Sequence, residues 1–152
     1  MPKFAFKLQP LLDARLQAEE QAQQALASLL REKLQIEGEL QRHQTAVAND
    51  KRTLGDALVG RVDLQRIRGH AAQVNRATLA AQQSAMRLVE LNRRIERARA
   101  ELAEATRQRK AIEVLRDRRL NRWRREQDRR ETAALDELAV QRRPRRREEV
   151  VA

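Results

Sequence analysis

The feature that most limits the fold of this chain is a long run without helix-breaking residues. Between Pro10 and Leu54 there is no further proline and a single glycine, Gly38. Ala, Leu, Arg, Glu and Gln dominate this run, and they are strong helix formers. Pro10 suits the first turn of a helix, where its missing N–H costs little. The run therefore predicts a first helix from about residue 9 to about residue 54.

A seven-residue repeat runs through this first helix. Apolar residues recur at two core positions of the repeat, interrupted by polar ones, which indicates a coiled coil. The first core position holds Leu12, Glu19, Leu26, Lys33, Leu40, Val47 and Leu54. The second core position holds Arg15, Ala22, Leu29, Ile36, His43 and Asp50. Additional leucines, which we expect to widen this apolar seam, are Leu16, Leu30 and Leu34.

A second repeat of the same kind begins near Val74, and helical composition continues to about Val140. Its first core position holds Val74, Ala81, Leu88, Ile95, Leu102, Arg109, Arg116 and Trp123. Its second holds Ala77, Ser84, Leu91, Ala98, Ala105 and Ile112. The repeat predicts a second helix over about 71–141, and Pro144 within the charged stretch "RRPRRREEVVA" predicts a disordered tail over 142–152.

Three of the four glycines, Gly55, Gly60 and Gly69, lie between the two repeats. They predict a turn region over 55–70, so that the helices fold back on each other. With the centre of the hairpin near residue 62, position i faces roughly position 124 − i, and apolar positions then meet along the seam. The expected fold is all-α: a long antiparallel coiled-coil hairpin over residues 1–141, with a second helix that overhangs. Beyond about Arg116 that helix is expected to have no partner within the chain.

The composition argues against an enzyme. Aromatic residues make up 2% of the chain and charged residues 36%, which leaves little material for a core with a cleft. There is no cysteine, and the only histidines, His43 and His70, lie in different elements. We therefore expect no catalytic residue, no metal site and no cofactor. The absence of a signal peptide and of any apolar run of about 18 residues predicts a cytoplasmic protein without a transmembrane segment.

Positive charge is concentrated near the end of the chain. The net charge is +11, and residues 107–147 contain 16 Lys and Arg against 7 Asp and Glu. Within "RRLNRWRREQDRRE", residues 118–131, the lone Trp123 is a poor stacking platform, and Glu126 and Asp128 would repel phosphates. Residues 124–132 include nothing apolar, so deep membrane insertion is disfavoured. We expect Trp123 to be an anchor for a protein partner.

Two stretches carry a resemblance to a known family. The opening "FAFKLQPLLDARLQAEEQAQQALA" and the closing "RQRKAIEVLRDRRLNRWRREQDRRETAALDELAVQRR" resemble those of the flagellar FliJ family, coiled-coil components of the flagellar type III protein export apparatus. The matching residues of the opening are Phe4, Phe6, Leu8, Leu11, Leu12, Arg15, Glu19, Glu20 and Ala22. Those of the closing signature are Arg109, Lys110, Glu113, Leu115, Leu135, Asp136, Glu137, Ala139 and Arg142.

The resemblance implies a non-enzymatic stalk, similar to the central stalk of rotary ATPases. Its partners would be the hexameric flagellar export ATPase, the membrane export gate protein and export chaperones. It would act in the cytoplasm, peripherally at the inner face of the cell membrane at the flagellar base. The residues expected to face the ATPase are Phe4, Phe6, Leu8, Leu12, Arg118, Arg122, Trp123, Arg125 and Leu138. Those expected to face the gate are Ile67, His70, Val74 and Ala77.

Three alternatives stay open at this point. The stalk proteins of related injectisome secretion systems are similar to this family. A basic coiled coil that binds nucleic acid or serves as another scaffold would share the composition, although the interspersed acidic residues disfavour nucleic acid. The residues assigned to the export gate would look the same if they were ordinary seam and turn residues.

Overall fold

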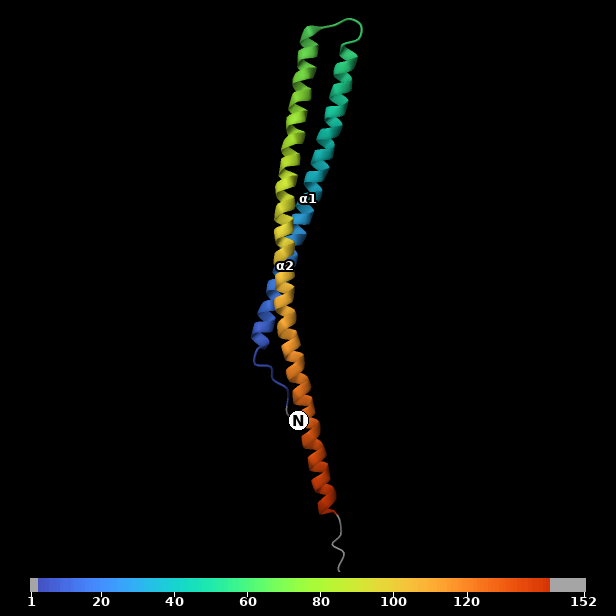
Figure 1. The fold of residues 1–152 in the computed structure, drawn as a ribbon. Helices are drawn as coiled ribbons and strands as arrows, with labels where there is room; N and C mark the ends of the chain where they lie inside the picture. The colour runs from blue at the N-terminus through green and yellow to red at the C-terminus, as the bar shows by residue number, and fades with distance from the viewer. Residues whose placement is uncertain (1–2, 143–152) are drawn as a thin grey trace, which may run out of the picture. The chain divides into compact units, whose positions relative to one another are not determined.

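The computed structural model describes residues 3–142, which form two long helices and no strand (Figure 1). Helix α1 spans Gln9–Ala57, and helix α2 spans Leu64–Gln141. The expectation of an all-α fold built from two long helices is therefore confirmed. Of the tail expected over 142–152, residues 143–152 lie outside the described residues. Within those residues, no helix has both the length and the apolarity that crossing a membrane requires.

Local hydrogen bonds explain where the helices begin. The backbone N–H of Gln9 donates to the carbonyl of Phe6 at 3.0 Å, so a turn leads into α1 just before Pro10. At the start of α2, the carboxylate of Asp63 accepts a hydrogen bond from the backbone N–H of Gln65 at 3.0 Å. This is the geometry of an N-cap, in which a side-chain oxygen satisfies a free N–H of the first turn.

The connection between the helices covers residues 58–63 and is shorter than the expected 55–70. Gly55 and Gly69 lie inside α1 and α2, and only Gly60 has a positive φ, of 84°. A glycine inside a helix costs about 1 kcal/mol relative to alanine, which neighbouring helix formers can offset. The cap at Asp63 also starts α2 earlier than the spacing of glycines suggests.

The chain divides into two compact units. The turn unit is Gln17–Thr106, and it holds most of α1, the connection and the first part of α2. The terminal unit combines Met1–Leu16 with Arg107–Ala152, of which residues 3–16 and 107–142 are described. In the turn unit the two helices lie antiparallel and side by side (Figure 1). Its core is the buried cluster of Ile36, Leu91 and Ile95, against which Leu26, Leu29 and Leu88 pack.

The seven-residue repeats describe the buried seam well. Every core position of the first repeat is buried or half-buried, and so is every core position of the second repeat except Arg116. The additional leucines do not widen the seam, because Leu16, Leu30 and Leu34 are all exposed. They follow core positions directly in the sequence and therefore point away from the opposite helix. The seam is consequently narrow.

Polar contacts across the turn unit report the register of the hairpin. Gln73 donates a hydrogen bond to Asp50 at 3.1 Å, and ion pairs join Arg87 to Glu39 at 3.1 Å and Arg94 to Glu32 at 3.9 Å. Each pair lies within two residues of the expected relation between i and 124 − i. Nearer the ends of this unit's helices, the hydroxyl of Thr106 donates to the largely buried carboxylate of Glu19 at 2.7 Å.

Truncation of one core leucine tests this seam. Replacing Leu91, which is 2% exposed, by alanine should lower the free energy of unfolding by about 2–5 kcal/mol, because the change removes buried contacts and leaves a cavity. The matched control is Leu34→Ala, since Leu34 is 69% exposed and should change stability by less than about 0.5 kcal/mol. Denaturant unfolding followed by circular dichroism measures both free energies. Equal losses of stability in the two variants would contradict the assignment of Leu91, but not Leu34, to the buried seam.

Candidate functional site

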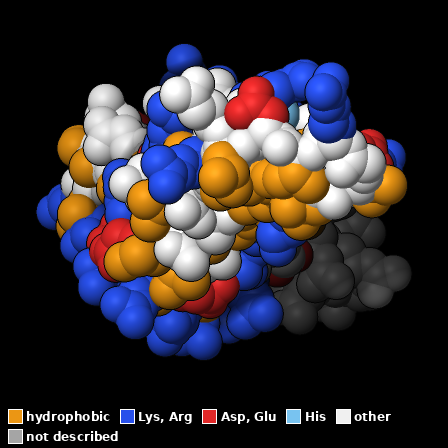
Figure 2. Space-filling view, turned by 90° about the horizontal axis from the view of Figure 1, so that it is seen from above, with side chains coloured by type: hydrophobic (Ala, Val, Ile, Leu, Met, Phe, Trp, Pro, Cys, Tyr) orange, Lys and Arg blue, Asp and Glu red, His pale blue; other side chains and the backbone are white. Residues whose placement is uncertain are grey.

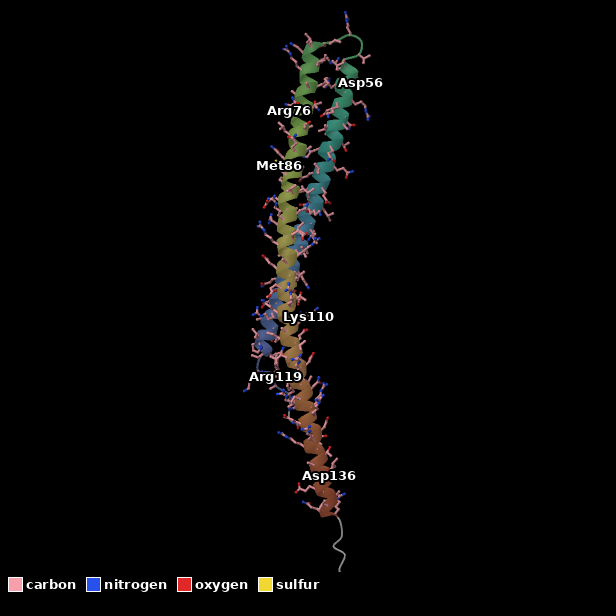
Figure 3. All side chains as sticks on the ribbon, in the orientation of Figure 1. Asp56, Arg76, Met86, Lys110, Arg119 and Asp136 are labelled. Carbon is pink, nitrogen blue, oxygen red and sulfur yellow. The ribbon has the colours of Figure 1, made fainter. Side chains whose placement is uncertain are left out.

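In the terminal unit, the N-terminal segment of residues 3–8 is not helical and lies against α2. Phe6 is buried, and the guanidinium carbon of Arg119 lies 5.7 Å from the centroid of its ring. The ring of Phe4 lies 6.0 Å from that of Trp123, centroid to centroid, with 55° between the planes. Figure 3 shows Arg119 on α2 beside this segment. We call residues 3–8 the N-terminal strap.

The strap corrects the expectation that α2 has no partner within the chain beyond Arg116. Trp123 is half-buried and in contact with Phe4, so it is not a free anchor. The register rule failed here because it assumed that only α1 could cover α2. A non-helical segment can reach further along a helix per residue than a second helix does, and both Phe4 and Phe6 contact α2. The signal was available, because the chain has only three aromatic residues and two of them open it.

The overhang of α2 is shorter than expected but present. Side chains from 128 to 142 are all exposed, so the last turns of α2 have no packing partner in the described part of the terminal unit. Among the residues predicted to face an ATPase, the apolar ones near the N-terminus are packed within the strap and the seam. Phe6 and Leu12 are buried, and Phe4, Leu8 and Trp123 are half-buried. The members left exposed are Arg118, Arg122, Arg125 and Leu138.

The exposed arginines form one face of α2. Arg118, Arg122, Arg125 and Arg129 follow helical spacing, and together with Asn121 and Glu126 they line a shallow depression. We call these four arginines the arginine face. Within residues 3–142, none of the four forms an ion pair within 4 Å, so their charge is available to a partner. Arg129 and Asn121 were missed by reasoning from the sequence, although the spacing of the predicted arginines continues to Arg129.

Other charged residues of the terminal unit are occupied internally. Arg15 donates a hydrogen bond to the side-chain oxygen of Gln108, and Arg109 pairs with Glu113 at 2.6 Å. Arg109 and Glu113 both belong to the closing signature. Their contact shows that this part of the signature stabilises α2 and holds Arg109 largely out of solvent, with 18% of its side chain exposed. It does not contribute to the arginine face.

The four residues predicted to face an export gate lie in the turn unit. Ile67, His70, Val74 and Ala77 are all half-buried and share one face of α2. His70 also lines a depression with Thr53 and Asp56 of α1. The burial of these residues is what seam positions show, so ordinary packing against α1 explains them without a partner. No group of three His, Cys, Asp or Glu residues placed to hold a metal ion occurs among residues 3–142.

The fluorescence of Trp123, the only tryptophan, tests the strap. Replacing Phe4 by alanine should shift the emission to longer wavelength and raise quenching by acrylamide, because the indole loses the ring that covers it. The control Leu11→Ala alters an exposed side chain of the same unit and should leave both readings unchanged. Identical quenching of the Phe4 variant and the parent would show that the strap does not cover Trp123.

Comparison with known proteins gives one finding. A model of the family described as "Flagellar FliJ protein" matches residues 4–148 of the 152-residue chain. The match includes residues 4–8 of the strap, both helices and the arginine face. No curated protein and no solved structure matches the chain.

Proposed function

This chain belongs to the flagellar FliJ family, and we propose from that premise that it is a non-enzymatic stalk of the flagellar type III export apparatus. Membership places the chain among components of flagellar protein export. The finer proposal is that its terminal unit docks in the ring of the hexameric export ATPase and promotes assembly and activity of that ring. It would also link the ring to the membrane export gate and to export chaperones, at the inner face of the cell membrane.

The observation that carries this proposal is the arginine face. Four exposed arginines without an ion pair on one face of α2 are suited to acidic loops of a protein ring. Long-range attraction between the two surfaces would speed their encounter and orient the helix as it enters the ring. Leu138 lies further along α2, in the stretch from 128 to 142 that has no packing partner among the described residues, and is 51% exposed, so it can add apolar contact.

The N-terminal strap supports the docking surface in a different way from the one expected. Phe4 contacts Trp123 and Phe6 contacts Arg119, and these two residues of α2 directly follow Arg122 and Arg118 in the sequence. We infer that these contacts fix the N-terminal segment to α2 and hold the helix beside it in one position. In this proposal Trp123 is a positioning residue, and the arginines make the contact with the ATPase.

Charge reversal tests the docking directly. The triple variant Arg118→Glu, Arg122→Glu and Arg125→Glu should weaken binding to the flagellar export ATPase at least about tenfold and reduce its activation, because attraction becomes repulsion. Point variants are sharper than deletion of residues 118–152. The deletion would also remove Arg119 and Trp123, and with them the anchors of the strap.

The control changes the net charge by the same amount elsewhere. Arg31, Arg76 and Arg97 are exposed residues of the turn unit, and their triple replacement by glutamate should leave ATPase binding close to that of the parent. Equal loss in both triple variants would mean that net charge, rather than the arginine face, governs binding. Retained ATPase binding with loss of salt-sensitive DNA binding would replace the stalk proposal with a nucleic-acid-binding coiled coil.

A further inference from the structure

The turn between α1 and α2 exposes four branched aliphatic side chains to solvent. They are Leu58, Val59, Val62 and Leu64, with exposed fractions of 56%, 79%, 51% and 69%. Turns usually consist of glycine, proline and small polar residues, because those types serve the local geometry and meet water at no cost. Aliphatic residues at this position have no role in the buried seam. We call these four residues the apolar tip.

The geometry of the connection keeps the apolar tip exposed. Helix α1 ends in two backbone hydrogen bonds between residues three apart in the sequence. The N–H of Leu58 donates to the carbonyl of Gly55, and the N–H of Val59 donates to the carbonyl of Asp56, each at 3.2 Å. Gly60, with φ of 84°, then reverses the chain, and Asp63 caps α2. The segment therefore spans the ends of the helices and has no neighbour to fold onto. Seen from above, apolar side chains gather beside Lys and Arg side chains (Figure 2).

Cations surround the apolar tip. Five exposed basic residues lie within two helical turns of it: Lys51, Arg52, Arg61, Arg66 and Arg68. Only two acidic residues lie in the same stretch, Asp56 and Asp63, and the second is engaged as the cap of α2. In the described part of the chain, none of these five cations has an ion-pair partner within 4 Å. The tip therefore combines unpaired positive charge with solvent-exposed aliphatic surface.

We propose that the apolar tip inserts into the surface of a membrane that contains anionic lipid. Aliphatic side chains at a chain reversal can enter the boundary between headgroups and acyl chains, while the cations beside them meet lipid phosphates. Protein interfaces are usually anchored by tryptophan, tyrosine or arginine set in a buried pocket, and the tip has neither aromatic residue. This contact goes beyond the proposed docking of the terminal unit and does not depend on it.

Vesicle binding by the full chain tests the proposal. The parent should bind vesicles that contain phosphatidylglycerol and not vesicles of pure phosphatidylcholine. The double variant Val59→Ser, Leu64→Ser should lower the partition coefficient onto the anionic vesicles about tenfold, with no change of net charge. The matched control is Leu34→Ser, Met86→Ser, which removes two exposed apolar side chains from the helices of the same unit and should bind like the parent.

These variants separate insertion from simple adsorption of a protein with a net charge of +11. Unchanged binding of the tip variant would overturn the proposal, because the arginines would then account for all of it. If the tip variant lost binding to a purified export-gate domain and the parent did not bind vesicles, the membrane proposal would be overturned in favour of a protein partner. The tip variant should still bind the export ATPase like the parent, so failure here is distinguishable from failure of the proposed function.

A second measurement reports whether the tip enters the vesicle membrane. The chain has no cysteine, so Val59→Cys and Leu34→Cys each allow labelling at one site with an environment-sensitive fluorophore. The label at position 59 should shift to shorter wavelength on anionic vesicles, and the label at position 34 should not. Circular dichroism confirms that each labelled chain keeps its helices. Equal shifts at both positions, or no shift at position 59, would exclude insertion of the tip.

Discussion

The narrow apolar seam between α1 and α2 is the interaction on which the rest of the structure depends. A hairpin of two helices has a single interface, so few side chains are removed from water, and Ile36, Leu91 and Ile95 form the central cluster of the turn unit. Long helices rich in charged residues gain little from packing elsewhere. Helices with charged outer surfaces therefore depend on the burial of their core positions, where polar residues such as Glu19 are held by hydrogen bonds.

The seam could be predicted from the sequence because a seven-residue period is a property of the chain alone. Burial at the core positions and the register of the hairpin follow from it. Two features could not be predicted this way. Leu34 looks like part of the seam by composition, but its place beside Lys33 in the repeat turns it toward solvent. Gly55 and Gly69 look like turn residues, but the helix formers around them and the cap at Asp63 extend the helices through both positions.

The candidate site also contains some features that could be predicted from the sequence and some that could not. The exposed arginines could be predicted from their density, and Arg129 follows from helical spacing. The contact of Trp123 does not follow from the seven-residue repeats, because Phe4, which lies against it, belongs to no repeat; the only signal was the pair of phenylalanines in the non-helical strap. Family signatures also mix two kinds of residue. Arg109 and Glu113 stabilise α2 through their own ion pair, whereas Lys110 and Glu137 of the same signature are exposed, so signature membership alone does not mark a docking residue.

The exposed end of α2 has a thermodynamic consequence. Since side chains from 128 to 142 lack a packing partner within the described terminal unit, no burial couples this stretch to global unfolding. Its helicity rests on the intrinsic helix propensity of its residues, which rising temperature opposes. We therefore expect amide hydrogens there to exchange through local fraying, and those beside Leu91 to exchange only when the hairpin opens. The two regions of one continuous helix thus respond to solution conditions on separate energy scales.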